Sequence, residues 1–500
     1  MPSAATRIPL LVKLAGMLSL SMYVPAIHAL LRDAHFEARV FFYWGTIGLA
    51  LVTALAVATA RHQSRNVTRS HLVALLSSFA LLPALAAIPL TELLPDTRFI
   101  NAYVEMVAAT TTTGGSVFAP ERLSETGHLW RALIGWQGGF LVWVSAVAIL
   151  APLQLGGYEI TRAEPVAPRR SNRMQAADPE ERVHRYAWLL MPIYLGLTAL
   201  LAAILTALGE SPTHAAIRAM STISTSGITP GGTLATPGAG IAGEVAIAAF
   251  LIFAISRQTF DANLSRDRAD RLREDRELRI AAIVVLAATT ALFVRHWIGA
   301  YEVDRVSNLL AALGALWGAA FTTLSFLTTV GFESSEWATA RAWSGLDAPA
   351  VLLAGLALFG GGVATTAGGV KLLRIYALYT HGRREMMILV HPHAVAGGKG
   401  RLRHLNVRGI EAAWIFFMLF AFSLAVITLA LGLGGLSFDH AVIVAVAALS
   451  TAGPLIDVAG GPELNTLHDF AKAVVAAAMV IGRLETLALI ALFNPDFWRS

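Results

Sequence analysis

The sequence predicts an all-α polytopic membrane protein, with four tandem helix–loop–helix repeats around a central axis after an N-terminal two-helix hairpin. Of the 500 residues, 56% are hydrophobic and 14% are charged, whereas soluble domains carry about 25% charged residues. Several apolar runs reach the roughly 20 residues that a membrane-spanning helix needs. Short loops of threonine and glycine recur four times between such runs, which indicates tandem copies of one unit.

The N-terminal hairpin is predicted over residues 1–65 and consists of the apolar runs Ile8–Leu30 and Val40–Ala60. No threonine–glycine loop separates the two runs, so the hairpin lies outside the four repeats. Basic residues follow the second run, at Arg61, Arg65 and Arg69. Because basic residues concentrate in cytoplasmic connections, this turn is predicted on the cytoplasmic side.

The first repeat is predicted over residues 66–160, with the uncharged runs Leu72–Leu90 and Ala132–Leu153 as its spans. Between them lie a shorter helical stretch, Phe99–Ala109, and the polar segment Thr110–Val117. This segment is too short and too polar to span a bilayer. Non-helical backbone persists at membrane depth only where it is buried in protein or lines a watery cavity. The segment is therefore either a ligand site or a packed re-entrant connection.

The four threonine–glycine loops are numbered in chain order. They are loop 1 (Thr112–Gly114), loop 2 (Thr225–Gly227), loop 3 (Thr329–Gly331) and loop 4 (Thr451–Gly453). Their glycines are 113, 104 and 122 residues apart, which is loosely periodic. The later repeats are predicted over 161–279, with cytoplasmic linkers, 280–400 and 401–500. The whole chain then holds roughly ten spans and four half-helices.

The basic residues are distributed unevenly between the connections. Arg257–Arg279 contains seven arginines, and Arg383–Arg408 is also basic, whereas Ser211–Gly243 has only Arg218 and Gly432–Phe470 has no Lys or Arg. The four loops are therefore predicted outside the cell and the basic linkers in the cytoplasm. The segment Arg257–Arg279 is either a solvated helical extension with internal ion pairs or a docking surface for a cytoplasmic partner.

Several function classes are excluded by what the sequence lacks. It contains no cysteine, which excludes disulfides, thiol catalysis and thiolate metal sites. It contains neither an H-E-x-x-H motif nor a nucleophile elbow, so an enzyme is not expected. The net charge of +5 reflects membrane topology and does not indicate a nucleic-acid partner. The remaining partner that composition implies is membrane lipid.

Together the loops and several further motifs resemble the Trk/Ktr family of potassium-uptake proteins. The membrane subunit of that family is similar to four fused potassium-channel pore units. The resemblance covers nearly the whole chain, including the N-terminal hairpin. Its motifs are Thr111–Gly114, Trp130–Arg131, Trp136–Gly139, Gly360–Lys371, Gly482–Glu485 and Phe493–Trp498.

The resemblance implies potassium uptake across the bacterial inner membrane by a homodimer bound to a cytoplasmic ring of nucleotide-binding regulatory subunits. The chain has no G-x-G-x-x-G Rossmann unit of its own, so nucleotide control would need such a partner, and no organic cofactor is expected in this chain. The alternative is a secondary transporter, such as a symporter, coupled to Na⁺ or H⁺. Such transporters bind substrate on several broken helices, whereas only one span here has a long glycine break.

The four loops are expected to form a K⁺ selectivity filter from backbone carbonyls, which replace the water around a dehydrated ion. Other L-residues resist the backbone angles that turn successive carbonyls inward, whereas glycine accepts them. The expected K⁺ ligands are Thr112, Thr113, Gly114, Thr225, Ser226, Gly227, Thr329, Val330, Gly331, Thr451, Ala452 and Gly453. Glu105, nine residues before Gly114, either supports its loop or contributes to the field at the ion.

A gate is expected in the third repeat, where a glycine-rich loop over residues 360–370 interrupts the last span. Each glycine costs a helix about 1 kcal/mol relative to alanine, although small residues also permit close helix packing. The resemblance implies an intramembrane loop that crosses the pore below the filter. Its expected gate residues are Gly360, Gly361, Gly362, Gly368, Gly369, Lys371 and Arg483.

Two of these gate residues carry a positive charge. Lys371 follows the glycine-rich loop, where it marks the cytoplasmic boundary or faces the cavity. Arg483 lies inside the apolar run Ala471–Phe493, where a charge usually faces a cavity or a partner. It is expected to project into the ion path as an electrostatic barrier, and a structural ion pair is the alternative.

Overall fold

The computed structural model describes residues 8–59, 67–151, 179–236, 238–256, 275–298, 309–346, 348–390 and 407–484. Within these ranges the regular secondary structure is helical, apart from one isolated bridge between Leu234 and Glu333. Eight of the described helices are long and apolar enough to cross a membrane, or nine if the bent pair α14 (Trp337–Ser344) and α15 (Pro349–Phe359) counts as one span. The all-α polytopic membrane fold is therefore confirmed.

The eight include α13 (Leu309–Leu327), which precedes loop 3, and omit three of the roughly ten spans expected. The last span of the third repeat is interrupted between α15 and α16 (Leu372–Val390), and the other two are described as shorter helices. Helix α10 (Gly240–Ile255) has 16 residues, and α20 (Asp469–Leu484) is described only as far as Leu484. The remainder of the predicted span Ala471–Phe493, including Glu485, lies outside the described residues.

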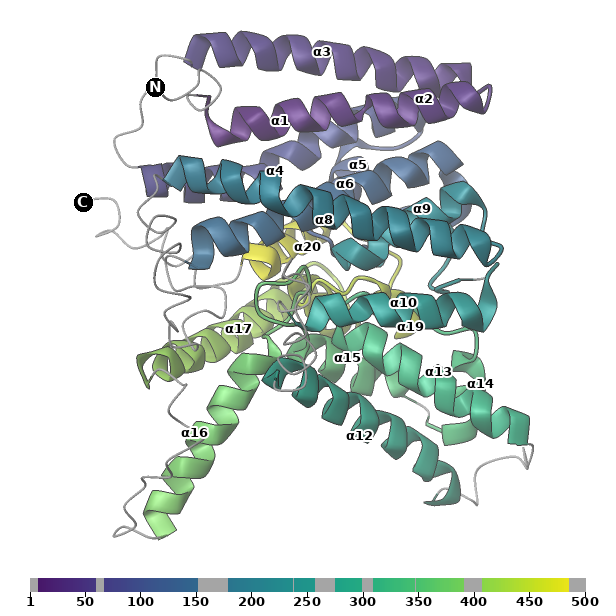
Figure 1. Cartoon of the computed structure of the whole chain (residues 1–500), viewed down its shortest axis with the longest axis vertical. Coiled ribbons are helices and arrows are strands. Elements are labelled where there is room, and N and C mark those ends of the chain that lie inside the picture. Colours follow the sequence, from purple (N-terminus) through teal and green to yellow (C-terminus); the bar gives the residue numbers. More distant parts are fainter. Residues whose placement is uncertain are drawn as a thin grey trace.

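The N-terminal hairpin consists of α1 (Leu10–Ser21), α2 (Tyr23–Leu31) and α3 (His35–Thr59). Helices α1 and α2 are two parts of one apolar span that is interrupted at Met22. The hairpin lies at one edge of the helix assembly, where α1 contacts α4, as Figure 1 shows. It thus covers the first group of helices and lies away from the last.

After the hairpin, four groups of helices follow one another, each with a helix that ends at one of the loops. The first is α4 (Val67–Leu93), α5 (Phe99–Thr110) and α6 (Glu125–Ser145); the second is α8 (Pro179–Ala207), α9 (Pro212–Ser224) and α10. The third is α12 (Arg276–Ile298), α13 (Leu309–Leu327), α14 (Trp337–Ser344), α15 (Pro349–Phe359) and α16 (Leu372–Val390). The fourth is α17 (Val407–Leu433), α18 (Phe438–Leu449), α19 (Pro454–Val458) and α20.

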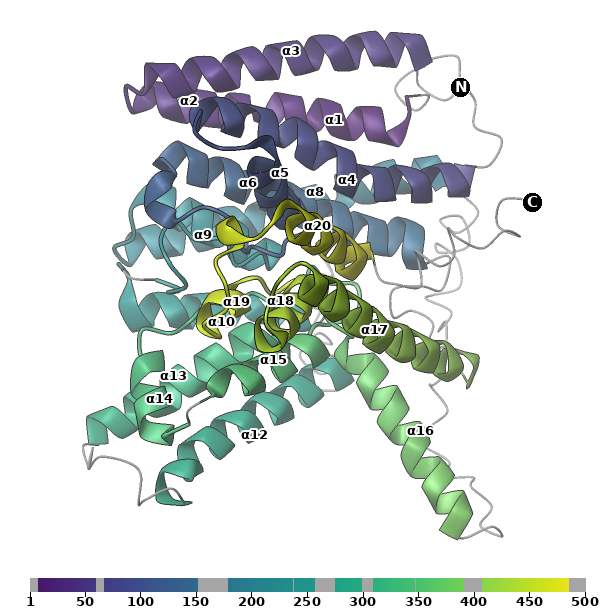
Figure 2. The same cartoon turned by 180° about the vertical axis from the view of Figure 1, so that it is seen from behind.

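Contacts between groups place them around a common centre. Helix α6 packs on α9, α10 on α13, α15 on α18, and α20 on α5. Each group therefore contacts the next, and the fourth returns to the first. Figure 2 shows α18, α19 and α20 between the first group and the third, and α16 extending away from the assembly.

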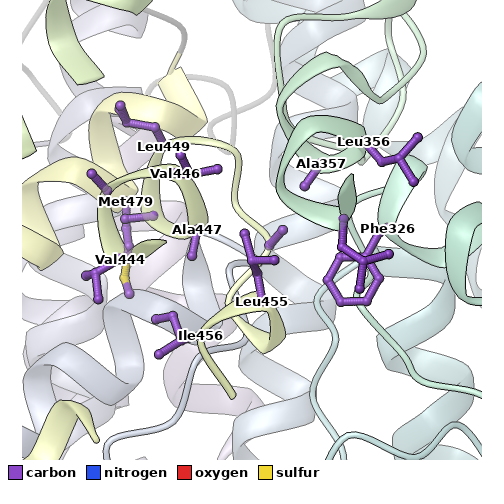
Figure 3. Packing of buried hydrophobic residues seen from close by; sticks show 14 of the residues in the cluster. Phe326, Leu356, Ala357, Val444, Val446, Ala447, Leu449, Leu455, Ile456 and Met479 are labelled. Carbon is purple, nitrogen blue, oxygen red and sulfur yellow. The ribbon is translucent and has the colours of Figure 1, made fainter. Parts of the chain in front are cut away.

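A large apolar cluster joins the third and fourth groups and supports loop 4. In Figure 3, Phe326, Leu356 and Ala357 lie on one side of this cluster, and Leu455 lies between them and the α18 side chains. All four are buried, and Leu455 follows loop 4 by two residues. Apolar packing therefore fixes the position of loop 4 against the third group.

Candidate functional site

Helices α5, α9, α13 and α18 all end in the same hydrogen-bond pattern. In each case the loop threonine donates its backbone N–H to the carbonyl three residues earlier, with N–O distances of 2.9–3.3 Å. The next residue donates to the carbonyl five residues earlier, at 2.8–3.0 Å. This is the Schellman arrangement, which terminates a helix and satisfies its last carbonyls. The donors in the second set are Thr113, Ser226, Val330 and Ala452.

The threonine that begins each loop has left-handed backbone. Its φ angle is 54° in Thr112 and Thr225, 59° in Thr329 and 53° in Thr451. Glycine usually occupies this position of a Schellman motif, and a β-branched residue there is strained by about 1–3 kcal/mol. The sequence had suggested that only the glycines would adopt unusual angles. The same strain at four equivalent places is typical of a functional site.

The glycines of the first three loops also have left-handed backbone, but Gly453 does not. Their φ angles are 77° in Gly114, 66° in Gly227 and 81° in Gly331, whereas Gly453 has φ −56° and ψ −38°. Gly453 is the residue that precedes α19, whose first residue is Pro454. Helical angles before proline bring its ring against the preceding Cβ, and glycine has no Cβ. The expectation that all four glycines serve the same backbone geometry therefore fails at loop 4.

The four loops contact one another in cyclic order. A β-carbon added to Gly114 would lie 1.7 Å from the Ser226 carbonyl oxygen, and one on Gly227 would lie 2.2 Å from that of Val330. One on Gly331 would lie 2.9 Å from the Cβ of Pro454. Loop 4 closes the circle, because the Gly453 N–H donates to the Thr113 carbonyl at 2.6 Å. We call this arrangement the loop ring; its contacts leave no room for a side chain at these glycines.

The threonine hydroxyls at the helix ends differ in their partners. Thr225 donates to the neighbouring Ser224 carbonyl at 2.7 Å. The Thr329 hydroxyl accepts from the Gly368 N–H at 2.9 Å, and the Thr451 hydroxyl accepts from Arg483 at 3.5 Å. The Thr112 hydroxyl is buried and has no hydrogen-bond partner among the described residues.

Buried carboxylates support the backbone beside the loops. Glu105 forms an ion pair with Arg131 and accepts the Val117 N–H at 2.6 Å. Glu244 supports the segment after loop 3 in the same way, accepting the Ser335 N–H at 2.6 Å. These contacts favour the structural interpretation of Glu105. Glu244 was not identified from the sequence, where an isolated acid near a span gives no sign of its distant partner.

The glycine-rich loop lies directly against the helix ends below the loop ring, and every residue from Gly360 to Val370 is buried. The Thr366 hydroxyl donates to the Ile223 carbonyl at 3.1 Å, and Gly368 donates to Thr329. A β-carbon on Gly368 would lie 2.3 Å from the Ser450 carbonyl oxygen. The glycine-rich loop thus contacts the ends of three of the four helices that precede loops 1 to 4.

The glycine-rich loop also contains strained backbone. Gly361 and Gly369 have left-handed φ angles of 81° and 74°, and so do Ala364 at 59° and Lys371 at 77°. Gly360 packs so closely on the Leu327 carbonyl oxygen that a β-carbon would lie 1.9 Å from it. Small residues are therefore required here by space as well as by backbone angles.

Arg483 and Lys371 both bind the glycine-rich loop. One Arg483 amino group donates to the Thr366 carbonyl, and the other donates to the Thr451 hydroxyl. The Lys371 ammonium donates to the Ala367 carbonyl. Both charged side chains are buried, so Arg483 joins the glycine-rich loop to loop 4 and Lys371 lies against the loop at its end.

An acidic side chain also follows loop 4, in a helix that is not among the candidate spans. Asp457 is exposed on one side, but partial desolvation by the surrounding chain and the nearby Glu333 carboxylate raise its pKa to about 6, and Arg131 opposes this shift. The ionised fraction of Asp457 therefore falls as the pH is lowered from 7 to 5. The sequence did not single out this residue, because Glu333 is far from it in the chain.

Several known proteins are similar to this chain in sequence or in fold. The family model described as "TrkH: Cation transport protein" matches residues 278–500. The Trk system potassium uptake protein TrkH of Salmonella typhimurium is 30% identical over 489 residues, which cover 96% of each chain. TrkG of Escherichia coli is 27% identical over 497 residues, covering 97% of each. The crystal structure of the potassium transporter TrkH from Vibrio parahaemolyticus aligns with a TM-score of 0.82 and 26% identity, covering 100% of both chains.

Proposed function

This chain belongs to the TrkH family of cation transport proteins, and we propose that it takes up potassium ions across the membrane through the loop ring. The observation that carries this proposal is the fourfold recurrence of one helix end, with a left-handed threonine and a closely packed glycine. Such a backbone can present successive carbonyl oxygens to a dehydrated cation. The C-terminal ends of four helices add a negative potential that favours a cation at the ring.

The K⁺ ligands in this proposal are backbone carbonyls of loops 1 to 4. The residue before each glycine is Thr113, Ser226, Val330 or Ala452. These side chains differ in chemistry, which fits a role for the backbone. Loop 4 contributes in a different way, because Gly453 has helical angles and its N–H already occupies the Thr113 carbonyl.

The gate in this proposal is the glycine-rich loop, closed in the described conformation. It binds the Thr329 hydroxyl directly and reaches the Thr451 hydroxyl through Arg483. Because strained backbone segments often have two accessible arrangements, the loop can move aside without unfolding its neighbours. Arg483 then acts both as a positive charge beside the ion path and as the link that holds the loop.

The proposed assembly is a homodimer in the bacterial inner membrane, with loops 1 to 4 outside and the basic linkers in the cytoplasm. A nucleotide-binding regulatory ring would contact those linkers, which lie largely outside the described residues. Charge reversal in Arg257–Arg279 and Arg383–Arg408 tests this part: the membrane protein should still fold but should retain less regulator in a pull-down. Unchanged retention would show that the linkers are only solvated.

The decisive experiment measures cation flux by the purified protein in liposomes under imposed gradients. We expect K⁺ or rubidium tracer uptake that exceeds Na⁺ uptake, without a requirement for a Na⁺ or H⁺ gradient. Uptake that depends strictly on such a gradient would favour the coupled-symporter alternative. Equal K⁺ and Na⁺ flux in a well-folded preparation would contradict the proposed filter.

A further inference from the structure

The glycine-rich loop has a second attachment, away from the loop ring. Its first part contacts the end of α10 and the first turn of α12. Gly362 donates its N–H to the Ala254 carbonyl at 3.2 Å, and Val363 donates its N–H to a Glu277 carboxylate oxygen at 2.9 Å. A β-carbon on Gly362 would lie 1.9 Å from the Ile255 carbonyl oxygen, so this part of the loop packs directly on the end of α10.

Glu277 belongs to a small buried cluster that joins α10 to α12. The Ser256 hydroxyl, directly after α10, donates to one carboxylate oxygen of Asp275. The other Asp275 oxygen accepts the Glu277 N–H at 2.9 Å, in the manner of a helix N-cap. We call Ser256, Asp275 and Glu277 the α10–α12 junction. All three are buried, and they flank the basic segment 257–274 in the sequence.

The contact between Glu277 and Val363 differs from the two neighbouring bonds at the start of the loop. Gly361 and Gly362 donate to backbone carbonyls, whose positions are fixed by helices. Val363 instead donates to a side chain 86 residues away in sequence. A hydrogen bond to a carboxylate is stronger than a neutral one, yet it breaks when the side chain rotates or α12 shifts. An N–H at this depth is costly without an acceptor, so loss of Glu277 should release this part of the loop.

We infer that Glu277, oriented by Asp275, is a positioning residue that holds the glycine-rich loop closed and couples it to movement of the α10–α12 junction. This inference rests on the proposed function, in which the glycine-rich loop is the gate. It adds a physical link between that loop and the cytoplasmic side of the protein. The basic segment joins the two helices of the junction. A regulator that separates Ser256 from Asp275 would therefore draw Glu277 away from Val363 and open the loop.

The first test compares K⁺ flux in liposomes without any regulator. Glu277→Ala should raise flux by about two- to tenfold, the range that corresponds to the net contribution of one hydrogen bond. Glu277→Gln keeps an acceptor for Val363 and should stay close to wild type. Glu411→Ala is the matched control, since Glu411 is an exposed acid near the start of α17 and should not change flux. A fall in flux for Glu277→Ala, or equal effects of Ala and Gln, would overturn the inference.

A second test repeats the Glu277 substitution in a variant with a shortened loop, to separate an effect on gating from an effect on folding. Deleting Val363–Ala367 shortens the glycine-rich loop and removes the Val363 N–H that Glu277 binds. In this background Glu277→Ala should have no further effect on flux if Glu277 acts through the loop. A further change of the same size as in the full-length chain would show that Glu277 acts elsewhere and would overturn the inference.

A third measurement needs no transport and therefore decides the inference even if the proposed K⁺ uptake fails. The chain has no cysteine, so Thr365→Cys introduces a unique thiol into the loop. Thr365 is 2% exposed, and a water-soluble thiol reagent should label it slowly. Adding Glu277→Ala should speed labelling by about two- to tenfold, whereas adding Glu411→Ala should not. Equal labelling rates in both double variants would show that Glu277 does not hold the glycine-rich loop in place.

Discussion

Loop 1 and loop 4 are neighbours in the ring and begin in the same way. They differ in the backbone angles of their glycines and in the hydrogen-bond partners of their threonine hydroxyls. Both follow a Schellman-type helix end and both begin with a left-handed threonine. Loop 1 continues with left-handed Gly114, and the Thr112 hydroxyl has no partner in the described part of the chain. Loop 4 continues with helical Gly453, and the Thr451 hydroxyl binds Arg483.

This difference separates two tasks that the four loops share. In the proposed function, the common helix end sets the carbonyl geometry and therefore concerns which ion binds. In the same proposal, the contacts below loop 4, through Arg483 to the Thr366 carbonyl, concern whether the ion can leave. Changes in loop 1 should consequently alter selectivity, and changes around loop 4 should mainly alter flux. The following predictions test that division, beginning with the largest expected effect.

Replacing Gly114 by Ser should have the largest effect and should act on selectivity. The new Cβ would collide with the Ser226 carbonyl oxygen, and a left-handed φ costs a non-glycine residue about 1–3 kcal/mol. Loop 2 must then move, which distorts one side of the ring. We expect the K⁺ to Na⁺ flux ratio to fall by about tenfold, equivalent to about 1.4 kcal/mol. The control is Gly196→Ser, because Gly196 has no close neighbour. An unchanged ratio in folded Gly114→Ser protein would contradict the filter assignment.

Replacing Arg483 by Gln should act on flux and leave selectivity unchanged. A unit charge about 6 Å from the ion is worth roughly 3 kcal/mol at an effective dielectric near 20. Water in the pore reduces this to about 1 kcal/mol, which corresponds to about fivefold in rate. The variant also weakens the link between Thr366 and Thr451, so both effects increase K⁺ flux. Flux should be measured per folded protein chain, and a well-folded variant with wild-type or lower flux would exclude the barrier role.

The division between loops 1 and 4 could be predicted only in part from the sequence. The length of an apolar run and the glycine content of a segment are local properties of the sequence. The spans, the four loops and the break at Gly360 could therefore be predicted from it. The left-handed threonines were not, because local preference disfavours a β-branched residue there. Helical Gly453 was equally hidden, since a following proline normally disfavours that conformation. The partners of Arg483 and Glu277 depend on contacts between residues 117 and 86 positions apart, which no local pattern reports.

Removing the loop threonine hydroxyls should reveal the same asymmetry with a smaller effect. Thr451→Val deletes the acceptor for Arg483, so it should raise K⁺ flux by about two- to threefold, the lower part of the range for one hydrogen bond. Thr112→Val removes a hydroxyl that binds neither Arg483 nor the glycine-rich loop in the described structure, so it should not relieve the gate. Both variants keep the β-branched shape. If both variants raised K⁺ flux equally, the threonine hydroxyls would act on the filter, and the proposed difference between loop 1 and loop 4 would be wrong.

Asp457, three residues after Pro454, should give the smallest effect, and it should depend on pH. Its carboxyl pKa is raised to about 6, so acidification from pH 7 to pH 5 removes a negative charge beside loop 4. A negative charge near the entrance raises the local cation concentration. Uptake at low K⁺ concentration should therefore decline by about twofold as the pH falls through 6, an effect that salt should reduce.

The variant Asp457→Asn should lack this pH response and should resemble the wild type at pH 5. Because the folded protein prefers the neutral carboxyl, the stabilisation from protonation is present at low pH and is lost as the pH rises through about 6. Asn keeps the side chain neutral, so the variant should melt at the same or a higher temperature than the wild type at pH 7. Lower uptake together with a lower melting temperature would indicate damage to α19. Lower uptake with unchanged melting would assign the effect to the charge, and an identical pH profile in both proteins would show that another group titrates.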